Sequence, residues 1–252
     1  MIRLPGATRS PGLSTVAAAP AVAGVLAVAL ISAAAASLGG LTSAALDAWS
    51  SAAATGAPSV VAWENFDGTN GTNLNGTTTD GGSRTWSRVG GTWTISSNRA
   101  VSTSADSYLH LNASSASRAV EVTVHRNGAT SFDGGPIVDG NSGASDLLSA
   151  DWTSNSNGSI ELWKKVGGGW TLLSAVTGLY PGGIATAPSS VTVRIDAVST
   201  SVVTVSLDGV VRITYTLTAG EQTTFKNGTH TYAGIISYNT NQLTFDNFHV
   251  DS

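Results

Sequence analysis

The chain of 252 residues contains no cysteine, so disulfide bonds cannot stabilise it and it has no thiolate nucleophile or thiolate metal ligand. Charged residues are also scarce, at 11 %, and the formal net charge is −4. Because no basic stripe is available to neutralise phosphates, nucleic acid is excluded as an expected partner. Ser, Thr, Asn and Gly supply most of the polarity, which gives a nearly uncharged surface suited to neutral polymers or simply to solubility outside a cell.

The N-terminal segment is the longest stretch without charge. Residues 10–46 contain no charged side chain and follow Arg3 and Arg9, and most of them are Ala, Val, Leu, Gly or Ser. A basic start followed by an apolar run is typical of a secretory signal. The apolar part could also form an uncleaved helix of ~20 residues across a bilayer. We therefore interpret residues 1–44 as a signal peptide or membrane anchor.

Either outcome exports the rest of the chain, which we expect to be extracellular or at the cell surface, with the N-terminal segment as its only membrane contact. Residues 45–58 are rich in Ala and Ser and are interpreted as a linker. Residues 59–252 are enough for one all-β domain. An exported domain of this size without cysteine favours a bacterial source.

The body alternates apolar and polar residues with a period of two, which is typical of β-strands. Asn-Gly and Asp-Gly turn signals separate these segments. We expect a two-residue hairpin turn at Asp208-Gly209 and a short helix or turn at residues 218–225. Many short strands with almost no helical period predict a two-sheet antiparallel sandwich. The clearest strand patterns lie at residues 92–95, 108–111, 119–124, 159–163, 191–195 and 203–207.

Four pieces of sequence carry a resemblance: Phe-Asp-Gly-Thr-Asn-Gly-Thr-Asn-Leu-Asn-Gly at 66–76, Asp-Gly-Gly at 80–82, Gly-Thr-Trp-Thr-Ile at 91–95 and the ending Leu-Thr-Phe-Asp-Asn-Phe-His-Val at 243–250. Together they resemble the concanavalin A-like lectin/glucanase superfamily. More narrowly, they are similar to the laminin G-like (LamG) jelly-roll modules of bacterial surface proteins and phage tail proteins. The resemblance implies two antiparallel sheets, one of them concave, with the first and last strands adjacent.

Members of this superfamily bind glycans, hydrolyse glycosides or serve as structural parts, so the fold does not choose the function. The hydrolases used for comparison carry Glu-x-Asp-x(-x)-Glu on one strand, and this chain has only four Glu, none of them two residues before an Asp. That pattern favours a chain that is not an enzyme. Acid groups from separate strands, for instance Asp151 and Glu161, stay open as an alternative pair.

Three tryptophans in the middle of the body are candidate sugar-binding residues. If Ile160 and Leu162 face the core, period two points Glu161 and Trp163 to the other face. Trp170 follows the next glycine-rich turn and is expected to be a cross-strand neighbour of Trp163.

Trp152, next to Asp151, lies one strand earlier. We therefore predict a ligand-binding set of Trp152, Trp163, Trp170, Asp151 and Glu161. The alternative is that the tryptophans only cover a sheet edge.

Acidic residues near the two ends of the body are candidate calcium ligands, because members of the superfamily often hold calcium. If the first and last strands pair, Asp67 and Asp246 come close together, with Glu64 nearby. Calcium prefers several carboxylate and carbonyl oxygens. The alternative is that these acids only form turns at strand ends. Asp133 falls in an expected loop and is assigned to neither set.

These observations lead to an exported, secreted or cell-surface module that binds a neutral glycan or cell-wall polysaccharide without cleaving it. A structural subunit or spacer of a surface layer or appendage, able to assemble with its own copies, is the second interpretation. A glycoside hydrolase with dispersed carboxylates is the third.

Overall fold

The structure is a computed structural model and describes residues 59–238 and 242–252. The predicted signal or anchor (1–44) and linker (45–58) lie outside the described residues. Among the residues that are described, no helix combines the length and apolar character needed to cross a bilayer.

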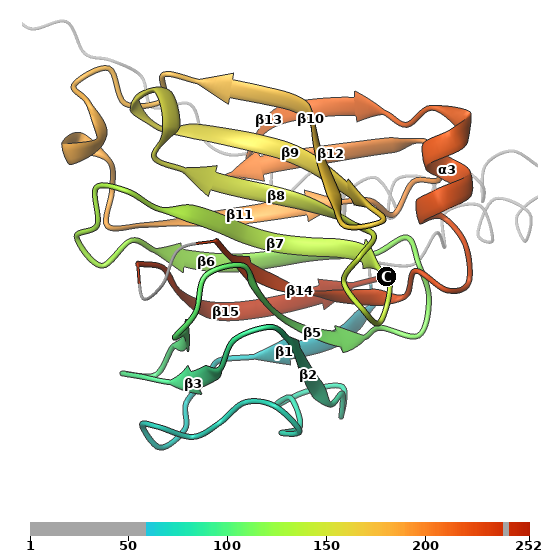
Figure 1. The fold of residues 1–252 in the computed structure, drawn as a ribbon, viewed down its shortest axis with the longest axis horizontal. Coiled ribbons are helices and arrows are strands. Elements are labelled where there is room, and N and C mark those ends of the chain that lie inside the picture. Colours follow the sequence, from blue (N-terminus) through green and yellow to red (C-terminus); the bar gives the residue numbers. More distant parts are fainter. Residues whose placement is uncertain (1–58, 239–241) are drawn as a thin grey trace, which may run out of the picture. The chain divides into compact units, whose positions relative to one another are not determined.

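Two antiparallel β-sheets make up most of the described chain (Figure 1). The eight-stranded sheet runs, in spatial order, through β13 (Val210–Thr216), β12 (Val202–Leu207), β11 (Ser190–Asp196), β6 (Ala119–His125), β15 (Thr244–Asp251), β4 (Ala100–Ser102) and β3 (Trp93–Ile95), with β1 (Val60–Glu64) also paired to β15. The seven-stranded sheet runs through β10 (Gly169–Thr177), β9 (Ser159–Val166), β8 (Leu147–Thr153), β7 (Asp133–Gly140), β14 (Tyr232–Ser237), β5 (Ser107–Asn112) and β2 (Trp86–Val89). The helical pieces are η1 (Asn155–Asn157), η2 (Ile184–Thr186) and α3 (Ala219–Phe225). The expected two-sheet antiparallel sandwich is confirmed.

The first and last strands lie side by side, as the resemblance implies. Glu64 of β1 stands opposite Phe248 of β15, and the other edge of β15 pairs with β6. The backbone N–H of Ser252 donates to the carbonyl oxygen of Ser59 at 3.0 Å, so the two ends of the sandwich domain are tied together.

Alternation along the strands accounts for the eight-stranded sheet. In β11 the apolar residues Val191, Val193 and Ile195 are buried, while the residues between them are partly exposed. The β12–β13 turn is the predicted two-residue hairpin, with φ of 50° at Asp208 and 75° at Gly209. Two consecutive positive φ angles are those of a type I′ turn, which Asp-Gly favours.

Aromatic side chains fill the core between the sheets near the paired ends. The ring of Trp86 lies 6.0 Å from that of Phe66 and 4.9 Å from that of Phe248, measured between centroids. Trp93 packs against Phe245 at 5.7 Å. Trp86 and Trp93 are both buried, whereas Trp63 of β1 is 40 % exposed.

The short helix expected at residues 218–225 is confirmed as α3. Its start is fixed by a capping box, in which the Thr218 hydroxyl accepts from the Glu221 N–H and the Glu221 carboxylate accepts from the Thr218 N–H. Glu221 also pairs with Lys164 of β9 at 2.8 Å, which anchors the helix to the seven-stranded sheet.

Lys226, at the end of α3, links the two sheets. Its almost fully buried ammonium group lies 2.5 Å from the carboxylate of Asp139 in β7 and donates to the carbonyl oxygen of Ala197, which follows β11. Asp139 also accepts from the backbone N–H of Ser117 at 2.7 Å. Burial raises the pKa of Asp139, and the nearby Lys226 opposes that rise. One buried cation therefore satisfies groups from both sheets.

We expect Lys226→Met to destabilise the fold strongly, because it leaves the Asp139 carboxyl group buried without its cation. Breaking a buried pair costs ~3–5 kcal/mol, which for a domain of this size lowers Tm by about 10 °C. Thermal denaturation followed by circular dichroism measures the change.

Lys164→Met is the matched control, because its ion pair with Glu221 is partly exposed and is worth only ~0–1 kcal/mol. Adding Asp139→Asn to Lys226→Met should recover part of the loss, since the buried charge is then gone. Equal losses from the two lysine variants would show that Lys226 does not hold the sheets together.

Candidate functional site

The side chains of β8 and β9 alternate between the core and the opposite face of the seven-stranded sheet. Trp152, Ile160 and Leu162 are fully buried in the core between the sheets. Because neighbours along a strand point to opposite faces, Asp151 and Glu161 point away from the core. We call the face that points away from the eight-stranded sheet the outer face. Asp151 and Glu161 stand directly opposite each other in the β8–β9 register.

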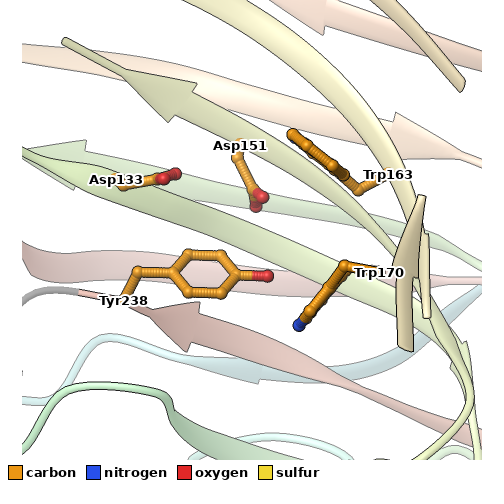
Figure 2. Close-up of a pocket in the computed structure, with 5 residues that line it drawn as sticks. All are labelled: Asp133, Asp151, Trp163, Trp170 and Tyr238. Carbon is orange, nitrogen blue, oxygen red and sulfur yellow. The ribbon is translucent and has the colours of Figure 1, made fainter. Parts of the chain in front are cut away.

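A pocket of about 220 Å³ lies on this outer face and is shown in Figure 2. Four adjacent strands contribute one side chain each, and the fifth follows β14. Its lining residues are Asp133 of β7, Asp151 of β8, Trp163 of β9, Trp170 of β10 and Tyr238. We refer to these five residues as the outer-face pocket.

Three aromatic rings form the walls of the outer-face pocket. Trp163 and Trp170 meet edge to face, with centroids 6.5 Å apart and planes at 89°. Trp170 and Tyr238 meet at 5.4 Å and 64°. In Figure 2 the Asp151 carboxylate points into the space between the rings, and the Asp133 carboxylate points toward it from the next strand.

A second apolar cluster supports the pocket from the same face. Trp170 and Tyr238 pack against a buried group formed by Tyr108, Ile137, Ala144, Leu147 and Ile236. Lys165 lies over this group, donating to the Tyr108 hydroxyl at 2.8 Å. Its ammonium nitrogen is 4.5 Å from the Tyr108 ring centroid and 5.4 Å from that of Trp170, both within the range of a cation–π contact.

Two of the carboxylates are held by neighbouring donors. Glu161 accepts from the Trp163 indole N–H at 2.9 Å and from the Ser159 hydroxyl at 2.7 Å. The Ser149 hydroxyl donates to Asp151, which is only 1 % exposed. One oxygen of Asp133, Oδ1, is buried without a hydrogen-bond partner.

None of these carboxylates has a cation beside it. Within residues 59–238 and 242–252, no ion pair involves Asp133, Asp151 or Glu161. Burial raises the pKa of Asp133 to about 7, and the negative charges of Glu161 and Asp106 add to the rise. Burial also raises the pKa of Asp151 well above its ordinary value. Both shifts favour the protonated form of these carboxyl groups, because burial disfavours the charged form.

Four of the five residues expected to bind a ligand come together here. Trp163, Trp170 and Asp151 line the pocket, and Glu161 holds the Trp163 ring by a hydrogen bond. The strand-face argument for Ile160 and Leu162 gave the correct orientation of β9.

Trp152 is the exception, and the structure corrects its position. It is 0 % exposed and packs in the core against Phe132 at 4.4 Å, with its indole N–H donating to the Tyr180 hydroxyl at 3.0 Å. The physical reason is period two, since Trp152 follows Asp151 and adjacent residues cannot both face outward.

The sequence interpretation missed two residues of the pocket, Asp133 and Tyr238. Asp133 was placed in a loop, but it is the first residue of β7. Tyr238 reaches the site because β14 pairs with β7, and its backbone N–H donates to the carbonyl oxygen of Asp133 at 3.0 Å. No local sequence signal reports that long-range pairing.

The predicted calcium ligands lie elsewhere in the structure. Glu64 and Asp67 line a second pocket together with Asp80, while Asp246 accepts from the Asn247 N–H beside it. The β1–β15 pairing includes neither Asp67 nor Asp246. Glu64 accepts from the N–H groups of Phe66 and Trp86, and burial raises its pKa.

Among the described residues, no group of three or more His, Cys, Asp or Glu side chains is placed to hold a metal ion. Calcium binding by these acids stays a prediction.

No protein-family model matches the chain, and no curated protein matches it in sequence. Solved structures do resemble it. The carbohydrate-binding module CBM66 from Bacillus subtilis has a TM-score of 0.54 at 15 % identity, over 66 % of this chain and 95 % of that one. An endo-β-1,3-glucanase from Pyrococcus furiosus has a TM-score of 0.50 at 12 % identity, over 77 % of this chain and 94 % of that one. The described residues therefore share the two-sheet antiparallel sandwich fold of these two proteins.

Proposed function

We propose that the protein binds a glycan in the outer-face pocket and does not cleave it. The observation that carries this proposal is the meeting of three aromatic rings and two carboxyl groups in one pocket on the outer face of a sandwich sheet. Aromatic faces stack on the C–H surfaces of sugars. Carboxyl oxygens accept hydrogen bonds from sugar hydroxyls, and a protonated carboxyl group also donates one.

The walls are positioned before any ligand arrives. The indole N–H of Trp163 is held by Glu161, and Trp170 packs against Tyr238 on one side and the apolar cluster below. Side chains fixed in this way lose little conformational freedom on binding, which supports affinity.

The fold supports the same class of ligand, because CBM66, a module of similar fold, is by name a carbohydrate-binding module. The proposed partner is a neutral glycan or a cell-wall polysaccharide. The apolar, uncharged run at residues 10–46, which follows Arg3 and Arg9, supports export and hence a secreted or cell-surface location. A structural subunit without a ligand is the alternative, and it gives no reason to keep carboxyl groups buried without cations beside aromatic rings.

Removing one wall of the pocket should weaken glycan binding without unfolding the domain. We expect Trp163→Ala to lower the binding free energy by ~1–3 kcal/mol, taking the scale of aromatic–base stacking as a guide. A glycan array first identifies the ligand, and isothermal titration calorimetry then measures the loss.

Trp63→Ala is the matched control, because Trp63 is 40 % exposed and lies on β1 of the other sheet. It should leave binding unchanged. Equal binding by wild type and Trp163→Ala, or an equal loss in Trp63→Ala, would contradict the placement of the site.

A glycoside hydrolase is the second candidate, and the raised pKa of Asp133 favours it. General acids of glycosidases hold their proton near neutral pH because burial raises their pKa. Asp133 would be the acid, with Asp151 or Glu161 as the second carboxyl group. Release of reducing ends from the glycan found on the array decides the matter. If the wild type hydrolyses the glycan and Asp133→Asn abolishes that hydrolysis, the hydrolase interpretation replaces the binding proposal. If no reducing ends are released even at high protein concentration, the binding proposal is supported.

The raised pKa of Asp133 also predicts how stability depends on pH. In the folded protein the pKa of Asp133 is raised to about 7, whereas in the unfolded chain Asp133 loses its proton near the ordinary aspartate pKa of 3.8. Stability from this group is therefore full at low pH and is lost as the pH rises toward 7.

The Tm of Asp133→Asn, compared with wild type, should be similar at low pH and higher above neutral pH. We expect a gain on the order of 1 kcal/mol, or ~2–4 °C. Because other acids also titrate, the difference between the two proteins is the quantity to follow. A difference that is constant across the range would show that Asp133 titrates as an exposed residue.

A further inference from the structure

We propose that the outer-face pocket binds a positively charged ammonium group, carried by a sugar with a free amine. This inference rests on the proposed glycan binding and names the class of sugar. Among cell-wall polysaccharides, it selects those that contain amino sugars without an N-acetyl group.

The side chains that line the pocket include acidic groups but no basic ones. Its five lining residues include two aspartates and no Lys, Arg or His, and Glu161 lies just behind the Trp163 wall. Asp133 leaves a buried oxygen without a partner. Ionising a buried carboxyl group without a counter-ion is unfavourable, so the empty pocket favours the protonated form of these groups. An incoming cation would stabilise the ionised form and supply the missing counter-ion. A neutral sugar supplies only hydroxyl groups.

The aromatic walls point to the same ligand. Ring faces attract cations, and several rings around one space form the cages that recognise substituted ammonium groups. Trp163 of β9, Trp170 of β10 and Tyr238, which follows β14, enclose the pocket. Trp170 already makes such a contact within the protein, with the ammonium nitrogen of Lys165 at 5.4 Å.

The size of the pocket and the chemistry of its lining favour a small ammonium-bearing group over a larger ligand or a metal ion. A volume of about 220 Å³ is below the ~300–1,000 Å³ of sites for drug-sized ligands, so one sugar or one head group fills it. A hard metal ion needs six or more oxygen ligands, whereas three of the five lining side chains are aromatic. An amine on a sugar ring matches both the rings and the carboxylates.

Two tetrasaccharides that differ only in their amines test the proposal. One is β-1,4-linked glucosamine and the other is its fully N-acetylated form, with a glucose tetrasaccharide as the neutral reference. Calorimetric titration is carried out at a pH where the free amine is protonated. We expect the amine form to bind at least about tenfold more tightly than the other two.

Variants then assign the preference to the pocket. Asp151→Asn and Asp133→Asn should each remove most of the preference for the amine form, because an amide of the same size cannot ionise to pair with a bound ammonium group. Asp208→Asn in the β12–β13 turn is the matched control for net charge and should keep the preference. Tetramethylammonium, followed by tryptophan fluorescence of the wild-type protein, tests the cage without a sugar and without any variant.

The outcomes separate the two proposals. Equal binding of all three tetrasaccharides overturns the ammonium inference and leaves glycan binding intact. Tetramethylammonium binding with no glycan bound supports the ammonium chemistry but overturns the glycan. Binding of neither probe overturns both.

Discussion

Apolar packing between the two sheets is the interaction on which the rest of the structure depends. Trp152, Ile160 and Leu162 fill the core from the seven-stranded sheet. Because neighbouring residues of a strand point to opposite faces, the residues next to them must point to the outer face. The outward direction of Asp151, Glu161 and Trp163 therefore follows from their neighbours along the strands, and hydrogen bonds such as that between Trp163 and Glu161 then orient the side chains. The pocket is a consequence of core packing on the other side of the same strands.

On the outer face, carboxyl groups without cations lower the stability of the fold, and core packing does not account for their presence. Asp151 is buried and Asp133 is partly buried in the same pocket, and burial raises the pKa of both. Neither has an ion-pair partner among the described residues. By contrast, the buried carboxylate of Asp139 has Lys226 beside it. Acidic groups kept in a pocket without cations, at a cost to stability, agree with the binding role proposed for this pocket.

Local sequence patterns predicted β9 and its neighbours but not the centre of the seven-stranded sheet. The period of two placed Glu161 and Trp163 on one face, and the glycine turn brought Trp170 beside them. The same period, applied to Asp151, should have sent Trp152 inward. Tyr238 was out of reach because pairing between β14 and β7 joins segments about a hundred residues apart.

Asp133 was missed because Gly134, Gly135 and Pro136 follow it, and glycine with proline argues against a central strand. The structure explains why these residues are needed. A Cβ atom on Gly135 would collide with the carbonyl oxygen of Ala150 in β8, and one on Gly134 with that of Ile236 in β14. Glycines therefore let β7 fit between its two neighbours. That close fit brings Asp133 into one pocket with Asp151. The glycines that make β7 hard to predict from the sequence are therefore the residues that allow Asp133 to line the site.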